Sequence, residues 1–285
     1  MTLARFLESS PYTRPADRKK LRFIHANLEE YARTVGKPLR ELTVLEPGCA
    51  DGGITLALAS LGGPIRSFDV DREAVEALEQ RLSARGIENV TVTEDDALSF
   101  DDGHAYDVIV AAEVISNVPD PKRFLHTMAR RLTSEGLLLL TTPNAYGPYV
   151  LSQRVVNPVA WLKRSNRLRA LLGRRPYERG EGGRAQYYSR AQFLRRQQLE
   201  GILAELGLRI VDTGHSDAVL ASLGSVYARS QRLGELDVRL ADRVPYWLAS
   251  GWFIAARGTA RPEATPTDED TLLAGVPPHG APPRS

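Results

Sequence analysis

The chain has 285 residues, of which 42% are hydrophobic and 25% are charged, and its formal net charge at pH 7 is +2. These proportions are typical of a soluble globular protein, and a net charge so close to zero argues neither for nor against a nucleic-acid partner. A single cysteine, Cys49, excludes an internal disulfide framework and a cysteine-based zinc site, so a reducing, cytoplasmic setting is expected. No stretch reaches the roughly 20 apolar residues that a membrane span needs.

The first predicted element is an amphipathic helix. Apolar residues recur at helical spacing from Asp17 to about Thr34, and residues 1–40 are expected to form a helical lead-in segment. A short apolar strand over residues 42–45 follows, and its composition is typical of a strand buried within a sheet. The regular part of the chain therefore begins near residue 41.

This first strand ends at a glycine-rich turn, in the stretch VLEPGCADGG of residues 44–53. Glycine loses more conformational freedom on folding than other residues, so three glycines in six residues indicate a tight turn or a backbone that approaches a ligand closely. A helix is expected to begin after the turn, at about Ile54. That geometry would point backbone N–H groups and the positive helix end at a ligand.

Strands and helices alternate at short intervals after the turn. Asp71 is a favourable N-cap for a helix over residues 72–84, and Pro121 begins a later helix. This alternation predicts a doubly wound, Rossmann-like α/β sheet of seven strands with helices on both faces. The further predicted strands occupy residues 64–69, 90–93, 106–111, 136–142, 208–211 and 252–256.

The regular alternation of strands and helices stops after Pro143. Residues 145–190 contain no clear strand and are predicted to form a helical cap inserted after strand five, within an α/β domain that spans residues 41–258. Residues 259–285 are rich in proline and polar residues and are expected to form a disordered tail. Two later segments are predicted to be largely helical, residues 190–206 and 217–248.

A strongly basic stretch overlaps the predicted cap. Residues 163–196 contain eleven Lys and Arg residues against two acidic residues, Glu178 and Glu181. Such a stretch suits a phosphate-bearing ligand or, beside Trp161 and Leu162, peripheral contact with an anionic membrane surface, and a solvated lid is the plainer interpretation. Nucleic acid is disfavoured because no segment resembles a known nucleic-acid-binding module.

Five short pieces follow one another in a fixed order between about residue 40 and residue 144: the glycine turn 46–52, the acid after strand two in 67–71, the acidic segment 94–97, strand four with its loop in 106–118, and the turn 132–137. In this order they resemble the motifs of the class I S-adenosylmethionine-dependent methyltransferases. One departure is Ala50, which stands where this family commonly has a glycine, and alanine is small enough to keep the backbone close to a ligand. The resemblance implies a sheet that ends in an antiparallel hairpin and a domain that binds S-adenosylmethionine.

The resemblance also assigns roles within the expected cofactor site. Asp69 would accept the ribose hydroxyls, Asp96 would accept the exocyclic amine of adenine, and the Ala97 N–H would donate to a ring nitrogen. Glu46 and Asp96 could instead be charges without a ligand, and Cys49 is favoured as a small filler of the turn over a nucleophile. Carboxylates near the sulfonium would offset its charge. The expected cofactor-binding residues are Glu46, Gly48, Cys49, Ala50, Gly52, Asp69, Asp96, Ala97 and Glu113.

The expected reaction is methyl transfer to a small or carrier-linked metabolite, at an oxygen atom. A hydroxyl acceptor needs a general base. His215, after strand six, is the candidate catalytic residue because imidazole accepts a proton near neutral pH, and an ordinary surface histidine is the competing interpretation. Residues 112–117 lack the motif of adenine-N6 methyltransferases, Cys49 does not lie where cytosine-C5 methyltransferases have their catalytic cysteine, and no cluster of acids predicts a metal site.

Two other function classes stay open. A non-catalytic regulator could bind S-adenosylmethionine without turnover. A NAD-dependent oxidoreductase could use the same kind of sheet, but its G-x-G-x-x-G fingerprint fits the spacing of Gly48, Gly52 and Gly53 less well. The expected partner is therefore a small-molecule or carrier-linked acceptor, and the sequence does not specify the oligomeric state.

Overall fold

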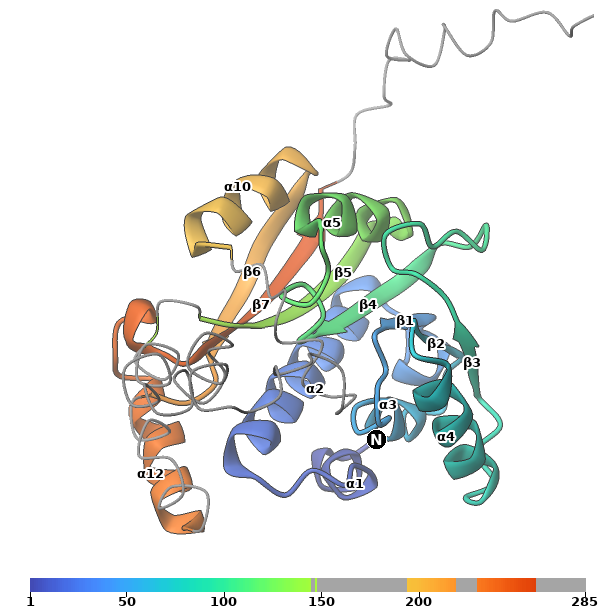
Figure 1. The fold of residues 1–285 in the computed structure, drawn as a ribbon, viewed down its shortest axis with the longest axis horizontal. Coiled ribbons are helices and arrows are strands. Elements are labelled where there is room, and N and C mark those ends of the chain that lie inside the picture. The colour runs from blue at the N-terminus through green and yellow to red at the C-terminus, as the bar shows by residue number, and fades with distance from the viewer. Residues whose placement is uncertain (145–146, 148–193, 219–229, 260–285) are drawn as a thin grey trace, which may run out of the picture.

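A seven-stranded sheet forms the centre of the molecule, with its strands in the order β3-β2-β1-β4-β5-β7-β6 (Figure 1). The predicted doubly wound α/β sheet is confirmed. The predicted cap over residues 145–190 lies, apart from Gly147, outside the described residues, as do most of the basic stretch and the tail from residue 260. The structure is a computed structural model that describes residues 1–144, 147, 194–218 and 230–259.

Strands β1 to β5 run parallel, and β7 runs antiparallel to both β5 and β6, which gives the sheet the antiparallel ending that the resemblance implies. Strand β6 continues past its predicted end at Val211 to His215, because an edge strand tolerates polar residues on its solvated side. The strands are β1 Val44–Pro47, β2 Ile65–Asp69, β3 Val90–Glu94, β4 Tyr106–Ala112, β5 Leu132–Pro143, β6 Leu208–His215 and β7 Gly251–Gly258.

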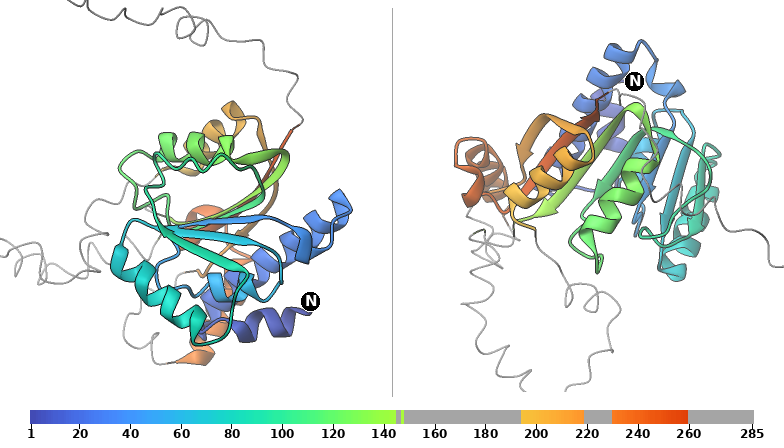
Figure 2. Two further views of the ribbon diagram at one scale, coloured as in Figure 1. Left: turned by 90° about the vertical axis from the view of Figure 1, so that its right-hand side faces the viewer. Right: turned by 90° about the horizontal axis from the view of Figure 1, so that it is seen from above.

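Helices cover both faces of the sheet (Figure 2). Asp71 caps α4 as predicted, since its carboxylate accepts the N–H groups of Glu73 at 3.0 Å and Ala74 at 3.4 Å. Among the described helices, none combines the length and the apolar character that crossing a bilayer requires. The helices are α1 Leu3–Ser9, α2 Pro15–Val35, α3 Thr55–Ala59, α4 Arg72–Ser83, α5 Pro121–Arg130, α10 Arg196–Glu205 and α12 Gln231–Ala241, with short 3-10 turns η1 Leu39–Glu41 and η3 Tyr246–Leu248.

Alternate residues of the central strands supply two separate cores. Successive side chains of a strand point to opposite faces, so an unbroken apolar strand can be buried on both sides. In Figure 1, α5 and α10 lie above the sheet and α1 to α4 lie below it. Val108, Val110, Leu137 and Leu139 belong to the core with α1, α2 and α3, whereas Ile109, Ala111, Leu138 and Leu140 belong to the core with α5 and α10.

The sheet order places a switch point between β1 and β4. Strand β1 pairs with β2 on one side and with β4 on the other, so the chain leaves β1 in one direction and later returns on the opposite side. In open α/β sheets, ligands bind beyond the carboxyl ends of the strands at such a point. The glycine turn directly follows β1 and therefore lies there.

Candidate active site

The glycine turn after β1 is tight because neighbouring side chains fill the space beside it. Gly48 has φ of +68°, and a Cβ at this position would lie 2.5 Å from Val114 Cγ2. Gly52 has φ of +74°, and its Cβ would lie 2.3 Å from Leu78 Cδ1. Ala50, where the family commonly has glycine, also adopts a positive φ of 43°. The turn thus requires small residues for its own packing and backbone conformation.

Most N–H groups of the turn donate within the protein. Those of Gly48 and Cys49 both donate to the Phe68 carbonyl, at 2.7 and 3.0 Å, and that of Gly52 donates to the Cys49 carbonyl at 2.8 Å. For these three groups the expectation that the turn points its N–H groups at a ligand is wrong, because the turn closes onto β2 and onto itself. What the turn offers a ligand is close approach of the backbone.

Asp69 joins the end of β2 to this turn. Its Oδ2 accepts the Ala50 N–H at 2.9 Å, and its Oδ1 accepts the Asp71 N–H at 3.0 Å. A carboxylate can accept about four hydrogen bonds, so each oxygen keeps capacity for a further donor. Asp69 is half-buried at the switch point, which leaves it well placed to accept a pair of hydroxyls.

Glu46 lies inside β1 and is only 3% exposed, so it is not a solvated charge. Ser67 on β2 donates its hydroxyl to Glu46 Oε2 at 2.8 Å. Burial raises the pKa of Glu46 to about 7, and the hydroxyls of Thr55 and Ser67 only partly offset this effect. The hydrogen bond between Glu46 and Ser67 therefore links β1 to β2 next to the glycine turn.

Cys49 is buried in the same turn, at 4% exposure. Burial, reinforced by the charges of Glu46 and Asp69, raises the pKa of its thiol far above the ordinary value. A thiol held protonated is a poor nucleophile, which agrees with the expectation that Cys49 is a filler.

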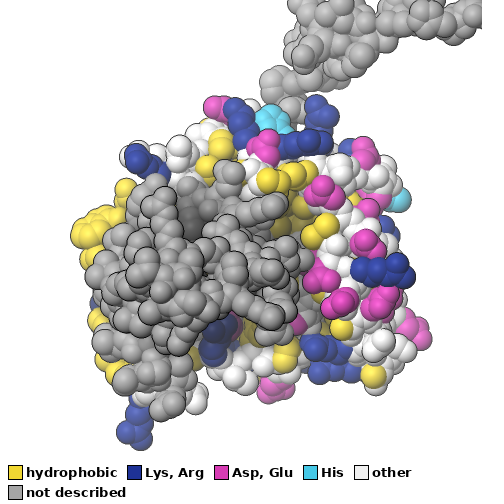
Figure 3. Space-filling model, viewed as in Figure 1, with side chains coloured by type: hydrophobic (Ala, Val, Ile, Leu, Met, Phe, Trp, Pro, Cys, Tyr) yellow, Lys and Arg dark blue, Asp and Glu magenta, His cyan; other side chains and the backbone are white. Residues whose placement is uncertain are grey.

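The acidic segment after β3 separates into two roles. Asp95 Oδ2 accepts the Thr93 hydroxyl at 2.7 Å and lies 3.7 Å from Arg66, so its carboxylate is held beside the strand. Asp96 is exposed, and its Oδ1 accepts the Leu98 N–H at 2.9 Å, while Ala97 is buried. In Figure 3, acidic side chains gather on the right of the visible face, over β2, β3 and α4. Asp96 is thus the better placed of the two acids for a ligand.

Glu113 directly follows β4 and occupies the left-handed region, with φ of 62°. Its N–H donates to the Thr141 carbonyl at 2.9 Å, and the Thr141 hydroxyl donates to its Oε1, also at 2.9 Å. Lys20 of α2 places its Nζ 3.4 Å from the same oxygen. The structure thus brings Glu113 to the switch point, next to the turn.

Three further residues near this edge belong to the lead-in segment and to none of the sequence motifs. Ser10 donates its hydroxyl to the Gly53 carbonyl at 2.7 Å, and Tyr12 donates to Asp51 Oδ1 at 3.2 Å. The third is Lys20. Only their distant partners distinguish these residues from ordinary polar residues of a helical segment, so no local pattern could have found them.

His215 is the last residue of β6, at the same edge as the glycine turn. Strands β5 and β7 separate β6 from β4, which corresponds to about 14 Å at ~4.8 Å per strand. Its Nδ1 lies 2.8 Å from the Ala241 carbonyl, which can only accept, so Nδ1 carries a proton. The structure does not bring His215 together with the turn and Asp69.

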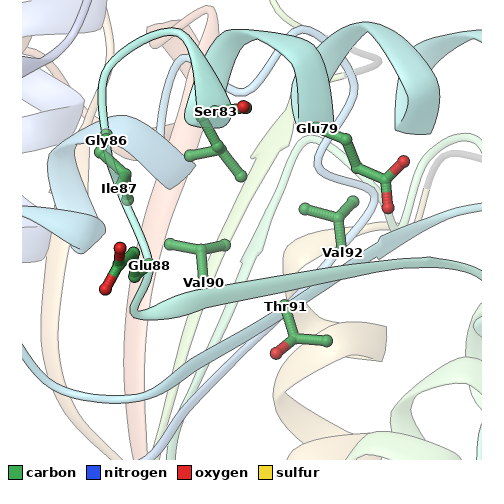
Figure 4. Close-up of a pocket in the computed structure, with 9 residues that line it drawn as sticks. Glu79, Ser83, Gly86, Ile87, Glu88, Val90, Thr91 and Val92 are labelled. Atoms are coloured by element: carbon green, nitrogen blue, oxygen red, sulfur yellow. The ribbon is translucent and has the colours of Figure 1, made fainter.

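A surface groove lies between α4 and β3 (Figure 4). Its lining includes Gly86, Ile87 and Val90, which precede or begin β3 and so lie at the amino end of the strand. This groove is remote from the carboxyl edge. Within the described parts of the chain, no group of three His, Cys, Asp or Glu side chains could hold a metal ion.

Comparison with known proteins identifies the family. Residues 17–213 match the family model described as a methyltransferase domain. The chain belongs to this family. S-adenosylmethionine is the methyl donor of class I members, so the cofactor expected from the motifs is confirmed along with the fold.

A curated relative of this methyltransferase is the ubiquinone biosynthesis O-methyltransferase of Nitrosomonas europaea, 28% identical over 110 residues. The match covers 37% of this chain and 46% of the relative, so the chain spans about half the length of that protein.

Solved structures share the fold at low identity. Magnesium protoporphyrin IX methyltransferase from Synechocystis PCC 6803, with bound S-adenosylhomocysteine, matches with a TM-score of 0.51 at 15% identity, over 90% of this chain and 93% of that chain. The [4+2]-cyclase SpnF matches with a TM-score of 0.50 at 15% identity, over 83% and 81% of the two chains. One fold thus carries methyl transfer in one protein and a cyclase activity in another, and its likeness alone does not specify the reaction.

Proposed function

We propose that this methyltransferase transfers the methyl group of S-adenosylmethionine to an oxygen atom of a small or carrier-linked metabolite. The observation that carries the proposal is the junction of Asp69 with the glycine turn at the switch point. Its carboxylate is fixed by two N–H groups and keeps acceptor capacity for a ribose diol. The relative named as an O-methyltransferase supports oxygen as the methylated atom.

The bound donor supplies an electrophilic methyl carbon on a sulfonium. In the proposed site, Gly48, Cys49, Ala50 and Gly52 let the backbone approach the donor. Asp69 accepts the ribose hydroxyls, and Asp96 and Ala97 bind adenine. Glu46 acts from beneath the turn by bracing β1 against β2, and Glu113 faces the donor from the end of β4.

His215 is the proposed general base on the ground of its place at the carboxyl edge. Its Nδ1 is held by the Ala241 carbonyl, so Nε2 would receive the proton. A general base must reach the same hydroxyl that attacks the methyl carbon, and β6 lies about 14 Å from β4, so this role requires the acceptor hydroxyl and the donor methyl group to meet on the β5 and β7 side of the turn.

The remaining parts of the chain extend the proposal. Residues 41–258 would form the catalytic domain, with the insertion 145–190 binding the acceptor, the lead-in segment 1–40 covering the edge, and residues 259–285 forming a tail. Contact of the basic stretch 163–196 with an anionic membrane surface belongs to the same proposal. Cys49, the only cysteine, agrees with a reducing, cytoplasmic compartment.

Isothermal titration calorimetry with S-adenosylmethionine, S-adenosylhomocysteine and NAD tests the proposal. Micromolar binding of both sulfur nucleosides with no binding of NAD is expected, and the reverse pattern would identify an oxidoreductase. Transfer of labelled methyl to a panel of hydroxylated and carrier-linked acceptors then separates an enzyme from a regulator. No binding of either sulfur nucleoside at millimolar concentration would refute the proposed function.

A further inference from the structure

Glu113 occupies a backbone position that suits a different residue. Its φ of 62° lies in the left-handed region, which glycine and asparagine adopt more easily than glutamate. The conformation is held from both sides: the Glu113 N–H donates to Thr141, and the Asn117 side chain donates to the Glu113 carbonyl at 2.7 Å. Strained backbone that is held by surrounding contacts clusters at active sites and ligand-binding sites.

The carboxylate of Glu113 is held through one oxygen only, among the residues that the structure describes. The Thr141 hydroxyl and Lys20 Nζ both approach Oε1, at 2.9 and 3.4 Å. The side chain is nevertheless 44% exposed, whereas that of Lys20 is 12% exposed. A partly exposed carboxylate thus lies at the end of β4, paired with a lysine whose side chain is mostly covered.

The backbone next to Glu113 adjoins the glycine turn that is proposed to hold the donor. The next residue, Val114, packs so closely against Gly48 that a Cβ there would lie 2.5 Å from its side chain. A negative charge at this edge stabilises a cation bound over the turn, and the low dielectric of a partly buried site strengthens the effect. A cation bound over the turn must share the negative charge of Glu113 with the ammonium group of Lys20.

Lys20 competes for Glu113 because Glu113 is its closer acidic neighbour. Asp17 Oδ1 lies 3.9 Å from Lys20 Nζ, against 3.4 Å for Glu113 Oε1. Asp17 also shares its charge with Arg14, which donates to Oδ2 at 2.7 Å. The adjacent Lys19 points elsewhere, since its Nζ bonds to Asp242 beyond α12 at 2.6 Å.

We propose that Glu113 distinguishes the sulfonium donor from its neutral thioether product, and that Lys20, acting through Glu113, sets the size of this preference. The inference rests on the proposed function. S-adenosylmethionine and S-adenosylhomocysteine share adenine, ribose and the amino-acid part, and differ in the methyl group and the charge on sulfur. The charge of Glu113 therefore favours the donor over the product, and Lys20 weakens that preference by partly neutralising Glu113.

Calorimetry on the full chain measures the preference as the ratio of the two dissociation constants, product over donor. Glu113→Gln keeps the shape and the acceptor for Thr141 but removes the charge, so the ratio should fall about tenfold with product affinity little changed. Lys20→Met removes the competing cation, so the ratio should rise several-fold. Lys20→Arg should restore a ratio close to that of the wild type.

Lys19→Met is the matched control, because it removes the same charge from the neighbouring residue of the same helix and should leave the ratio unchanged. Thermal denaturation of each variant checks that it is folded. If the wild type binds both nucleosides but Glu113→Gln leaves the ratio unchanged, or Lys20→Met and Lys19→Met shift it equally, the inference is wrong and the proposed function stands. If the wild type binds neither nucleoside, both the inference and the proposed function are wrong.

Discussion

At the scale of one residue, Asp69, which is proposed to bind the donor, also has a structural role. Its two oxygens accept the N–H groups of Ala50 and Asp71, on opposite sides of the carboxylate. The sequence predicted the ribose role from the position of an acid after a strand. It could not predict the bond to Ala50, which depends on how closely β1 and β2 end together.

Asp69→Asn should weaken binding of S-adenosylmethionine at least tenfold. The amide replaces one acceptor by a donor, so it must either lose a backbone N–H bond or leave a ribose hydroxyl unpaired. Calorimetry measures the effect. Glu94→Gln is the control, since it removes the same charge from the exposed end of β3, and its affinity should stay near that of the wild type. Equal affinity for Asp69→Asn and the wild type would refute the ribose role.

Gly48→Ala should lower the free energy of unfolding by more than Gly86→Ala. Both glycines have positive φ, at +68° and +63°, so both substitutions add left-handed strain of about 1–2 kcal/mol. Only at Gly48 does the new Cβ meet a neighbour, Val114 Cγ2 at 2.5 Å, which should add about 1–3 kcal/mol of overpacking. Urea denaturation of the two variants measures the difference. Equal losses would mean that the contact relaxes without cost.

At the scale of elements, the lead-in segment does more than the sequence indicated. Its first helix, α1, is short, with Phe6 and Leu7 as its buried residues, so no periodic pattern reveals it. The Phe6 ring lies 5.0 Å from that of His25 on α2, and both side chains are buried in the same part of the core. Beyond α1, Tyr12 covers Gly53, so the segment packs against the glycine turn at the carboxyl edge of the sheet.

Phe6→Ala should lower the free energy of unfolding by about 3–5 kcal/mol, because it leaves a cavity at a fully buried side chain. Leu3→Ala on the same helix is the control. That side chain is 39% exposed, and its loss should cost under ~1 kcal/mol. Chemical denaturation followed by circular dichroism measures both. Similar small losses would show that α1 adds little to the stability of the fold.

Helices with a clear capping residue and an apolar stripe were predicted with nearly correct ends. For α4, the Asp71 cap and the buried Val75, Leu78 and Leu82 are local features of the sequence. Strand β5 was predicted from Gly136 but begins at Leu132, because its first residues pair with β4 across an irregular register. Local pattern thus defines an element, while its length depends on the neighbour with which it pairs.

At the scale of the whole molecule, the stability of the ligand-free protein should depend on pH through the buried carboxyl group of Glu46. Burial raises its pKa to about 7, whereas the carboxyl group of an unfolded chain has a pKa near 4.5. The folded state therefore keeps a proton that the unfolded state loses. The contribution of this proton to the free energy of unfolding is fully present below about pH 4.5 and is lost as the pH rises to about 7.

Glu46→Gln should remove this pH dependence. The free energy of unfolding of the wild type, relative to that of the variant, should fall by about 3 kcal/mol between pH 4.5 and pH 7. Taking the difference between the two proteins cancels the contributions of other groups, among them His25, whose pKa is lowered by burial. Denaturation curves at several pH values measure it. Parallel stability profiles would show that Glu46 ionises normally in the folded protein.

The sequence by itself determined the alternation of strands and helices, the glycine turn and the acids at the strand ends, because these depend on neighbouring residues. Only the tertiary structure decided that the turn's N–H groups are used internally, that Glu46 is buried, and that Lys20 reaches Glu113. These contacts join residues far apart in the chain, and the order of the strands brings them together. No local periodicity or motif spacing encodes that order, because it is settled by which apolar faces pack and which strand edges pair.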